Sequence, residues 1–271
     1  MDSILKNIQA GIADYPGRIE ILRQILGLLD LTTLEGTDNE ERIKVLCNKA
    51  LSFGNYNLPL PAAVCVYPPF IKFARKLLDG SGVNVASVVG AFPSGQLPLQ
   101  LRVNECIYAV SEGAHEVDMV ISRGAFLAGD YQFIVDEVSA MKQACGEVHL
   151  KVILETGELG TTDNIKLASE LAIKGGADFI KTSTGKIQPA ATPEAMFTML
   201  QVIHSEYVIN GRMIGIKPAG GISTPDQAMI YYLLVKQING DAWLNNHFFR
   251  IGASRLADGI LAELQENQAI H

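Results

Sequence analysis

Short apolar runs alternate with longer amphipathic stretches along the whole chain. The apolar runs are rich in Val and Ile, which is typical of strands buried on both faces of a parallel sheet. We expect eight strands, at residues 28–32, 62–67, 83–92, 116–122, 150–156, 179–184, 213–217 and 248–253.

Between these runs, apolar residues recur at helical spacing, for example over residues 131–144, 164–174 and 193–207. Two helix starts are marked by a threonine that is followed by proline, at Thr192 and Thr224. Gln227 stands three residues after Thr224, which is the spacing of a capping box.

Eight strands that alternate with helices predict an α/β fold, a parallel (β/α)8 barrel of the TIM type in a single domain. A doubly wound open sheet is the alternative that this pattern leaves open. We expect residues 1–27 to form an N-terminal helical extension, packed over the bottom of the barrel or against a partner. Residues 28–271 would form the barrel domain.

Composition narrows the class of protein further. The chain has 271 residues, of which 48% are hydrophobic and 19% charged, so it can bury a large core. A net charge of −7 argues against nucleic acid as a partner, so an anionic substrate would need local positive charge. No run approaches the ~18 apolar residues of a membrane span. The first residues also lack a signal pattern, and we therefore expect a cytoplasmic protein without a membrane partner.

Cysteine and histidine spacing predicts neither disulfides nor a metal site. The four cysteines show no C-x-x-C pair, which suits a reducing compartment. The five histidines are scattered without the spacing of metal ligands. These residues are Cys47, Cys65, Cys106 and Cys145, and His115, His149, His204, His247 and His271.

The most informative residues are Lys181 and Lys217, each near the end of a predicted apolar strand. Lysine is rarely buried without a partner, because removing an ammonium from water is costly. Adjacent strands lie about 4.8 Å apart, so one ammonium could lower the pKa of the other and leave a neutral, nucleophilic amine. Either lysine alone could instead reach solvent or pair with a carboxylate, but two at corresponding positions favour a reactive site.

Asp118 interrupts another apolar strand and resembles Lys181 in position. Residues 113–118 align with residues 176–181, which places Asp118 and Lys181 on strands four and six, where inward side chains share a layer. An acid–base or water-orienting role would explain a carboxylate there. The alternative is a structural salt bridge to Lys151, which interrupts the next strand.

The first strand ends with Asp30 and Thr32, which could order substrate hydroxyls or serve only a turn. The loops after strands seven and eight are rich in glycine, and barrels often bind phosphate with these two loops. Glycines let backbone N–H groups approach an anion, although any barrel also needs turns. Ser254 or Arg255 could complete such a site, and Lys186 adds positive charge at the same rim.

Six segments together resemble one family, deoxyribose-phosphate aldolase, a class I aldolase with a TIM-barrel fold. The resemblance extends from about Leu28 to Ala257. Its most specific segments are Phe179-Ile-Lys-Thr-Ser-Thr-Gly-Lys186 and Gly215-Ile-Lys-Pro-Ala-Gly-Gly221. The others are residues 29–34, 64–68, 116–120 and 151–157.

The resemblance implies a role for each matching residue. Lys181 would form the Schiff base, Lys217 would lower its pKa, and Asp118 would act as acid and base through a water. The other matches would bind substrate: Lys186, Gly220, Gly221 and Ser254 on the phosphate side, and Asp30, Thr32, Cys65 and Lys151 in the pocket. We also expect Gly252 and Arg255, in the loop after the eighth strand, to bind substrate.

The family reaction is the reversible cleavage of 2-deoxy-D-ribose 5-phosphate to D-glyceraldehyde 3-phosphate and acetaldehyde, in deoxyribose phosphate catabolism. The resemblance implies no metal and no organic cofactor. The partners would be the phosphorylated sugar and acetaldehyde, and a homodimer is compatible with this interpretation.

Three positions depart from the family pattern. Ser223 stands where some members have Arg, and Arg255 where some have a second Ser, which could move a cation from one phosphate loop to the other. The chain ends in His271, without the terminal Tyr of some members. Two alternatives stay open: another Schiff-base barrel, such as a transaldolase or an aldolase with a longer donor, and a non-catalytic protein that binds pyridoxal phosphate or a sugar phosphate.

Overall fold

Eight parallel strands form a closed barrel in the computed structural model, which describes residues 2–269. The strand order is β7-β6-β5-β4-β3-β2-β1-β8, and isolated bridges from Ile216 to Phe249 and from Ala219 to Gly252 join β7 to β8. This order confirms the (β/α)8 barrel and excludes an open doubly wound sheet. The strands are β1 (Leu29–Thr32), β2 (Ala63–Val66), β3 (Asn84–Val89), β4 (Glu116–Val120), β5 (His149–Ile153), β6 (Phe179–Lys181), β7 (Gly215–Lys217) and β8 (Ile251–Ala253).

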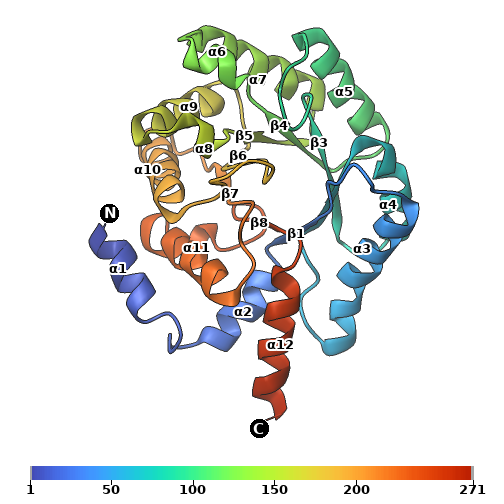
Figure 1. The fold of residues 1–271 in the computed structure, drawn as a ribbon, viewed down its shortest axis with the longest axis vertical. Helices are drawn as coiled ribbons and strands as arrows, with labels where there is room; N and C mark the ends of the chain where they lie inside the picture. Colours follow the sequence, from blue (N-terminus) through green and yellow to red (C-terminus); the bar gives the residue numbers. More distant parts are fainter. Residues whose placement is uncertain (1, 270–271) are drawn as a thin grey trace.

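Helices surround the barrel as an outer layer (Figure 1). They are α1 (Asp2–Ala10), α2 (Arg18–Leu26), α3 (Glu40–Ser52), α4 (Ile71–Leu77), α5 (Leu99–Ser111), α6 (Arg123–Leu127), α7 (Tyr131–Cys145), α8 (Thr156–Leu159), α9 (Thr162–Lys174), α10 (Pro193–Asn210), α11 (Pro225–Ile238) and α12 (Leu256–Ala269). Within residues 2–269, three short 3-10 helices also occur: η1 (Phe53–Tyr56), η2 (Pro68–Phe70) and η3 (Asp241–Trp243).

The two predicted helix caps are confirmed. The side chain of Thr192 accepts a hydrogen bond from the backbone N–H of Ala195. Thr224 and Gln227 form a complete capping box, in which each side chain accepts from the other's backbone N–H. These bonds satisfy amide groups that have no partner within the first turn of a helix, so both helices begin where the sequence predicts.

Alternate residues of each strand face opposite sides of the barrel wall. The outward set, such as Leu31, Val64 and Val152, packs with the helices in one large hydrophobic core. The inward residues of β2 and β3 form a small separate apolar cluster, which includes Ala63 and Cys65. Most of the buried charged residues lie on the remaining strands or directly beside them, so the interior has an apolar side and an ionic side.

Several strands are shorter than their hydrophobic runs. The run expected to extend to Phe92 ends as a strand at Val89, because Gly90 and Ala91 adopt positive φ angles of 78° and 61° and turn the chain. The run from 179 to 184 ends at Lys181, although the Thr182 N–H still donates to the carbonyl of Lys217. The predicted runs therefore extend past the strands into loops at the carboxyl edge of the barrel, through half-buried Ala91 and Phe92 after β3 and buried Thr182, Ser183 and Thr184 after β6.

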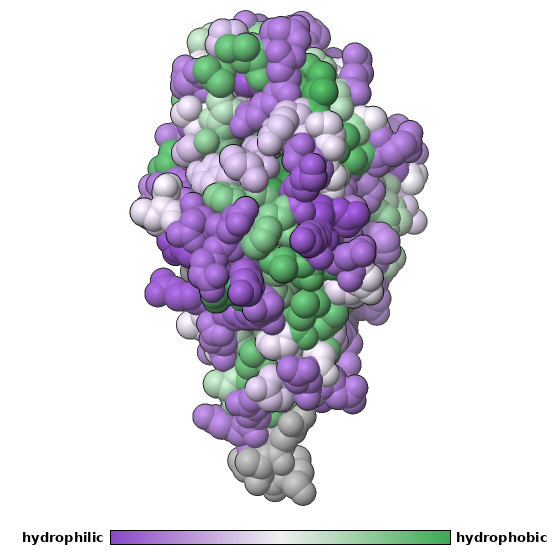
Figure 2. Space-filling view, turned by 90° about the vertical axis from the view of Figure 1, so that its right-hand side faces the viewer, coloured by the Kyte–Doolittle hydropathy of each residue, from purple (hydrophilic) through white to green (hydrophobic). Residues whose placement is uncertain are grey.

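The N-terminal residues form two helices, α1 and α2, before the first strand. Helix α1 contacts α11, and α2 contacts both α11 and α12 (Figure 1). The extension therefore packs on the outer helical layer, not over the bottom of the barrel. The side that bears α3, α4 and α5 shows hydrophobic residues scattered among hydrophilic ones (Figure 2). Between residues 2 and 269, no helix combines the length and apolar character needed to cross a membrane.

Candidate active site

Lys181 and Lys217 are the last residues of β6 and β7, and their Cα atoms are register partners. Asp118 lies in the middle of β4 and is fully buried. Its Oδ2 atom lies 2.8 Å from Nζ of Lys181 and 2.8 Å from Nζ of Lys217. The two lysine nitrogens are therefore no further apart than twice that distance, and one carboxylate oxygen lies between them.

Asp118 also forms the structural salt bridge to Lys151 that was the alternative to an acid–base role. Nζ of Lys151 lies 2.9 Å from Oδ1 of Asp118 and forms a close ion pair with Glu116. Asp118 therefore contacts Lys151 through one carboxylate oxygen and both Lys181 and Lys217 through the other.

A second carboxylate and an arginine extend this network. Asp30 contacts Lys217 through Oδ2 at 2.5 Å and Arg250 through Oδ1 at 2.8 Å. Arg250 also pairs with Glu116 at 2.6 Å. We call the side chains of seven residues the ionic cluster, and each of these residues is at most 3% exposed: Asp30, Glu116, Asp118, Lys151, Lys181, Lys217 and Arg250.

Charge balance within the ionic cluster singles out one lysine. The cluster contains three carboxylates and four basic groups, so it is neutral when one basic group loses its proton. Lys151 and Lys217 each have at least two carboxylates within 4 Å, and the guanidinium of Arg250 stays protonated in proteins. Among the residues that the structure describes, Lys181 has one carboxylate partner, Asp118. It is therefore the amine that gives up its proton at the lowest cost.

The pKa shifts also indicate that Lys181 loses its proton more easily than Lys217. Burial lowers the pKa of Lys181, and the neighbouring Lys217 lowers it further, against the opposing effect of Asp118. Burial would also lower the pKa of Lys217, but Asp118 and Asp30 outweigh it and raise the pKa above its usual value. For Asp118, the penalty of burial is overcome by Lys151, Lys181 and Lys217, which hold the pKa well below its usual range. The arrangement therefore contains a reactive amine beside a permanent ammonium and an ionised carboxylate.

A cavity of about 320 Å³ opens above the ionic cluster at the carboxyl ends of the strands. Lys181 reaches it, whereas Lys217 and Asp118 do not line it. Six other predicted residues line the cavity: Thr32, Lys186, Gly220, Gly221, Gly252 and Ser254.

The remaining predicted residues lie elsewhere. Asp30, Cys65 and Lys151 are fully buried inside the barrel and do not line the cavity. Burial raises the pKa of the Cys65 thiol to about 11, so it stays protonated at neutral pH. Arg255 is exposed and does not line the cavity either.

The glycine turn after β7 lies tightly against its neighbours. Gly220 and Gly221 have φ angles of 83° and 78°, which L-residues with side chains rarely adopt. A Cβ atom on Gly220 would lie 2.8 Å from the Cα of Gly185. The turn therefore presents backbone to the cavity, and a side chain at Gly220 would collide with the loop that bears Lys186.

Two departures from the family pattern are exposed at or beyond the rim. The N–H of Ser223 donates to the side chain of Gln227 at the start of α11, and Ser223 does not line the cavity. The expectation that Arg255 moves a cation to the phosphate loops has no support in the cavity lining. Arg42 of α3 lines the cavity instead. The chain end at His271 lies outside the described residues.

Sequence reasoning missed Glu116 and Arg250 in the ionic cluster, and Arg42 and Glu35 at the cavity. Arg250 stands in the apolar run Phe248-Phe-Arg-Ile, so the criterion that identified the lysines would also have found it. Glu116 shares the Asp118 motif. Arg42 lies on an ordinary charged helix face, and Glu35, which pairs with Lys186 at 3.0 Å, lies in a loop. Neither has a distinguishing sequence signal.

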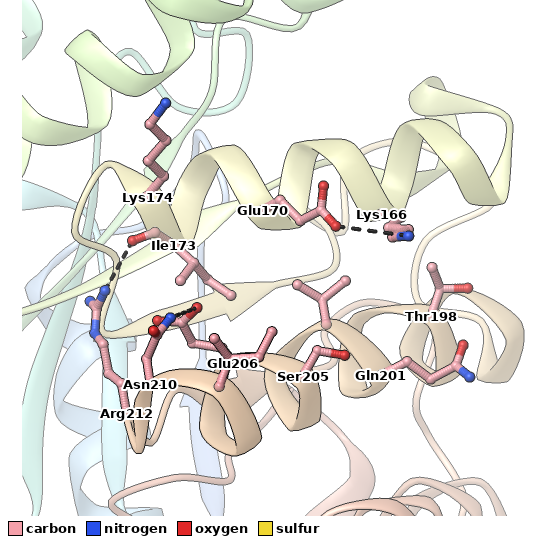
Figure 3. A pocket seen from close by; sticks show the side chains of 12 residues that line it. Lys166, Glu170, Ile173, Lys174, Thr198, Gln201, Ser205, Glu206, Asn210 and Arg212 are labelled. Carbon is pink, nitrogen blue, oxygen red and sulfur yellow. Dashed lines mark hydrogen bonds and ion pairs between the residues drawn. The ribbon is translucent and has the colours of Figure 1, made fainter.

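A larger groove of about 590 Å³ lies between α9 and α10 on the outer layer (Figure 3). Two of its basic side chains contact neighbours: Arg212 donates to the carbonyl of Ile173, and Lys166 lies 3.9 Å from Glu170. None of the ionic cluster lines this groove. The chemistry of the chain therefore belongs to the smaller cavity.

A closed parallel barrel with a buried lysine–carboxylate cluster under a cavity at its carboxyl edge defines a class, that of lysine-dependent barrel enzymes. A family model for DeoC/LacD family aldolases matches residues 25–242. The chain belongs to this family.

Curated relatives and solved structures agree with the family. The deoxyribose-phosphate aldolase of Homo sapiens is 43% identical over 252 residues, which cover 88% of this chain and 79% of the human protein. The Mus musculus protein of the same name is 42% identical, with the same coverage. The tetrameric deoxyribose phosphate aldolase of Aeropyrum pernix has a TM-score of 0.71 at 25% identity, covering 98% of this chain and 99% of that one.

Proposed function

We propose that this chain is a class I aldolase that reversibly cleaves 2-deoxy-D-ribose 5-phosphate to D-glyceraldehyde 3-phosphate and acetaldehyde. The observation that supports this most is Lys181, a buried amine with a lowered pKa that reaches the cavity. The relatives of known name act on a deoxyribose phosphate, and the chain covers more than two thirds of their length.

The reaction would begin with attack of the neutral Lys181 amine on the aldehyde carbon of the open-chain sugar. Uptake of one proton and loss of water then form a protonated imine, which withdraws electrons from the adjacent carbons. The bond between C2 and C3 then breaks, its electron pair moves into an enamine, and the proton of the C3 hydroxyl is removed. Protonation and hydrolysis of the enamine release acetaldehyde and restore Lys181.

Asp118 and Lys217 would have distinct parts in these steps. Asp118 is ionised, because Lys151 and Lys217 stay charged beside it when Lys181 is neutral, so its resting form accepts a proton and does not donate one. We infer that it exchanges protons with the substrate through a water. Lys217 stays charged and raises the cost of protonating Lys181.

The phosphate would bind at the glycine turn after β7 and the loop after β8. Backbone N–H groups near Gly220 and Gly221 and the hydroxyl of Ser254 are suitable donors to phosphate oxygens. Lys186 and Arg42 would add the positive charge that the acidic chain needs there. In this proposal Arg42 takes the place that sequence reasoning had given to Arg255.

Among the alternatives, another Schiff-base aldolase uses the same lysine chemistry with a different donor. Trapping with borohydride separates the two. The proposal predicts that acetaldehyde adds mass to the peptide that contains Lys181 and that dihydroxyacetone does not. Trapping of dihydroxyacetone alone would favour the other aldolase. Normal cleavage activity in Lys181→Ala would rule out the mechanism.

An absorbance spectrum distinguishes the proposed aldolase from the non-catalytic alternative. A pyridoxal-phosphate protein would show the visible band of an internal aldimine, which our proposal does not expect. A homodimer stays a prediction, and sedimentation of the purified chain tests it.

A further inference from the structure

Glu155 is a buried carboxylate that the proposed reaction does not use. It follows β5 by two residues and is fully buried. Its backbone angles are φ 58° and ψ 61°, in the left-handed region that residues with side chains rarely occupy. A non-glycine residue is kept in such a conformation only where its surroundings require it, often near a functional site.

The carboxylate of Glu155 is directed at Thr184, which lies in the loop after β6. The Thr184 hydroxyl donates to Oε2 at 2.5 Å, and the Thr184 N–H lies 3.3 Å from Oε1. On its other side, Oε2 lies 3.4 Å from a guanidinium nitrogen of Arg123. Both donors of Thr184 are therefore used by one carboxylate.

This contact continues to Lys186. The Thr184 hydroxyl oxygen accepts a hydrogen bond from the N–H of Lys186 at 3.1 Å. Thr184, Gly185 and Lys186 all line the cavity above the ionic cluster. Glu155 itself does not line the cavity. Its effect on a ligand would pass through Thr184 to the residues that do.

Packing on both sides limits where this loop can lie. A Cβ atom on Gly157 would lie 2.1 Å from the carbonyl oxygen of Pro189, so the end of the loop rests directly on the turn after Glu155. On the other side, the Cα of Gly185 would lie 2.8 Å from a Cβ on Gly220. The loop is thus held between the Glu155 turn and the glycine turn of the cavity.

We propose that Glu155 is a positioning residue for the phosphate side of the substrate: it holds the Thr184–Lys186 segment so that Lys186 and the adjacent backbone face the phosphate of the sugar. This inference rests on the proposed function, because it takes the anion at this rim to be the substrate phosphate.

The test compares substrates with and without the phosphate. In Glu155→Gln, one Thr184 donor faces an amide NH2 in place of an acceptor oxygen. In Glu155→Gly, the left-handed backbone is kept and the carboxylate is lost. Both variants should raise KM for 2-deoxyribose 5-phosphate by roughly tenfold or more, the effect of losing a hydrogen bond to a charged group. The inhibition constant of inorganic phosphate should rise in parallel.

The same variants should leave kcat/KM for unphosphorylated 2-deoxyribose nearly unchanged, since Lys181 is not displaced. Glu158→Gln is the matched control, because Glu158 also pairs with Arg123, at 2.7 Å, but does not bind Thr184. It should leave both substrates unaffected. If the Glu155 variants do not fold, Thr184→Val removes the same hydroxyl donor and should give the same selective rise in KM.

An equal loss of activity toward both substrates, or no change in KM for the phosphorylated one, would overturn the positioning role. Failure of the proposed function looks different. In that case borohydride would trap no adduct on Lys181 of the unmodified chain with either sugar.

Discussion

At the scale of single residues, the number of partners determines which lysine is reactive. Lys181 and Lys217 occupy the same register on neighbouring strands, and both contact Asp118. Only Lys217 has a second carboxylate, Asp30, within 2.5 Å. Burial penalises both ammoniums, but that one extra ion pair keeps Lys217 charged while Lys181 loses its proton more readily.

We expect Lys217→Leu to reduce kcat/KM at pH 7 by roughly 100-fold, because loss of the neighbouring ammonium raises the pKa of Lys181 and removes most of the neutral amine. The sign follows from charge: without the neighbouring ammonium, Lys181 binds its proton more tightly. Activity should therefore recover as the pH rises. The measurement is the pH profile of kcat/KM, with the exposed Lys236→Leu as the control. An unchanged profile would remove the tuning role.

Arg250 neutralises Asp30 and Glu116 inside the barrel. Arg250→Leu should lower the free energy of unfolding by roughly 3–5 kcal/mol, because it leaves buried carboxylates without a cation. Urea unfolding measures this loss. A loss below about 1 kcal/mol, as for an exposed pair, would mean that the cluster tolerates the charge imbalance.

The residue scale also shows what sequence could predict of the site. Lys181, Lys217 and Asp118 were recognisable because a charged residue in an apolar strand is costly to bury without a partner. Arg250 met the same criterion and was overlooked. Glu35 and Arg42 lie in a loop and on an exposed helix face, and only the closed fold brings them to the cavity.

At the scale of elements, the sequence predicted which segments form strands and helices better than it predicted where each strand ends. Val- and Ile-rich runs identified all eight strands, and Thr-Pro pairs identified two helix starts. The ends of β3 and β6 were missed because the chain stays half-buried at Ala91 and Phe92 after β3 and buried at Thr182 to Thr184 after β6, so the sequence pattern does not mark where the strand pairing stops. The positive φ of Ala91, which helps end β3, has no sequence signal.

Gly252 of β8 has no side chain, and this leaves space for the side chain of Lys217. A Cβ on Gly252 would lie 2.9 Å from the Cβ of Ala219 and 3.1 Å from Cε of Lys217. Gly252→Ala should therefore cost about 1–3 kcal/mol of stability and also displace Lys217. Thermal unfolding and kcat measure the two effects. Gly11→Ala is the control, since nothing lies within 4 Å of its added Cβ. Full activity in Gly252→Ala would contradict this close packing.

At the scale of the whole molecule, barrel closure brings together charges from strands far apart in the sequence. Asp30 of β1 meets Lys217 of β7, and Arg250 beside β8 meets Glu116 of β4. The alternation of strands and helices predicted the barrel, but it could not predict these pairs, because they depend on the stagger of the closed sheet. The position of the N-terminal helices against α11 and α12 was not predicted either.

Acid should destabilise the molecule through this cluster. The pKa values of Asp30, Glu116 and Asp118 are all lowered in the fold, against the effect of burial, by the surrounding basic groups. Their stabilisation is present above the unfolded pKa of about 4 and is lost as the pH falls below it. Urea unfolding at pH 6, 4 and 3 should give steadily falling free energies. Equal stability at pH 6 and pH 3 would contradict the depressed pKa values.

The central claim is that Lys181, and not Lys217, forms the bond to substrate. The most direct test is reduction with borohydride in the presence of 2-deoxyribose 5-phosphate, followed by peptide mapping. We predict a stable adduct on the peptide that contains Lys181 and none on the peptide that contains Lys217. An adduct on Lys217, or no adduct while the sugar is cleaved, would contradict the account.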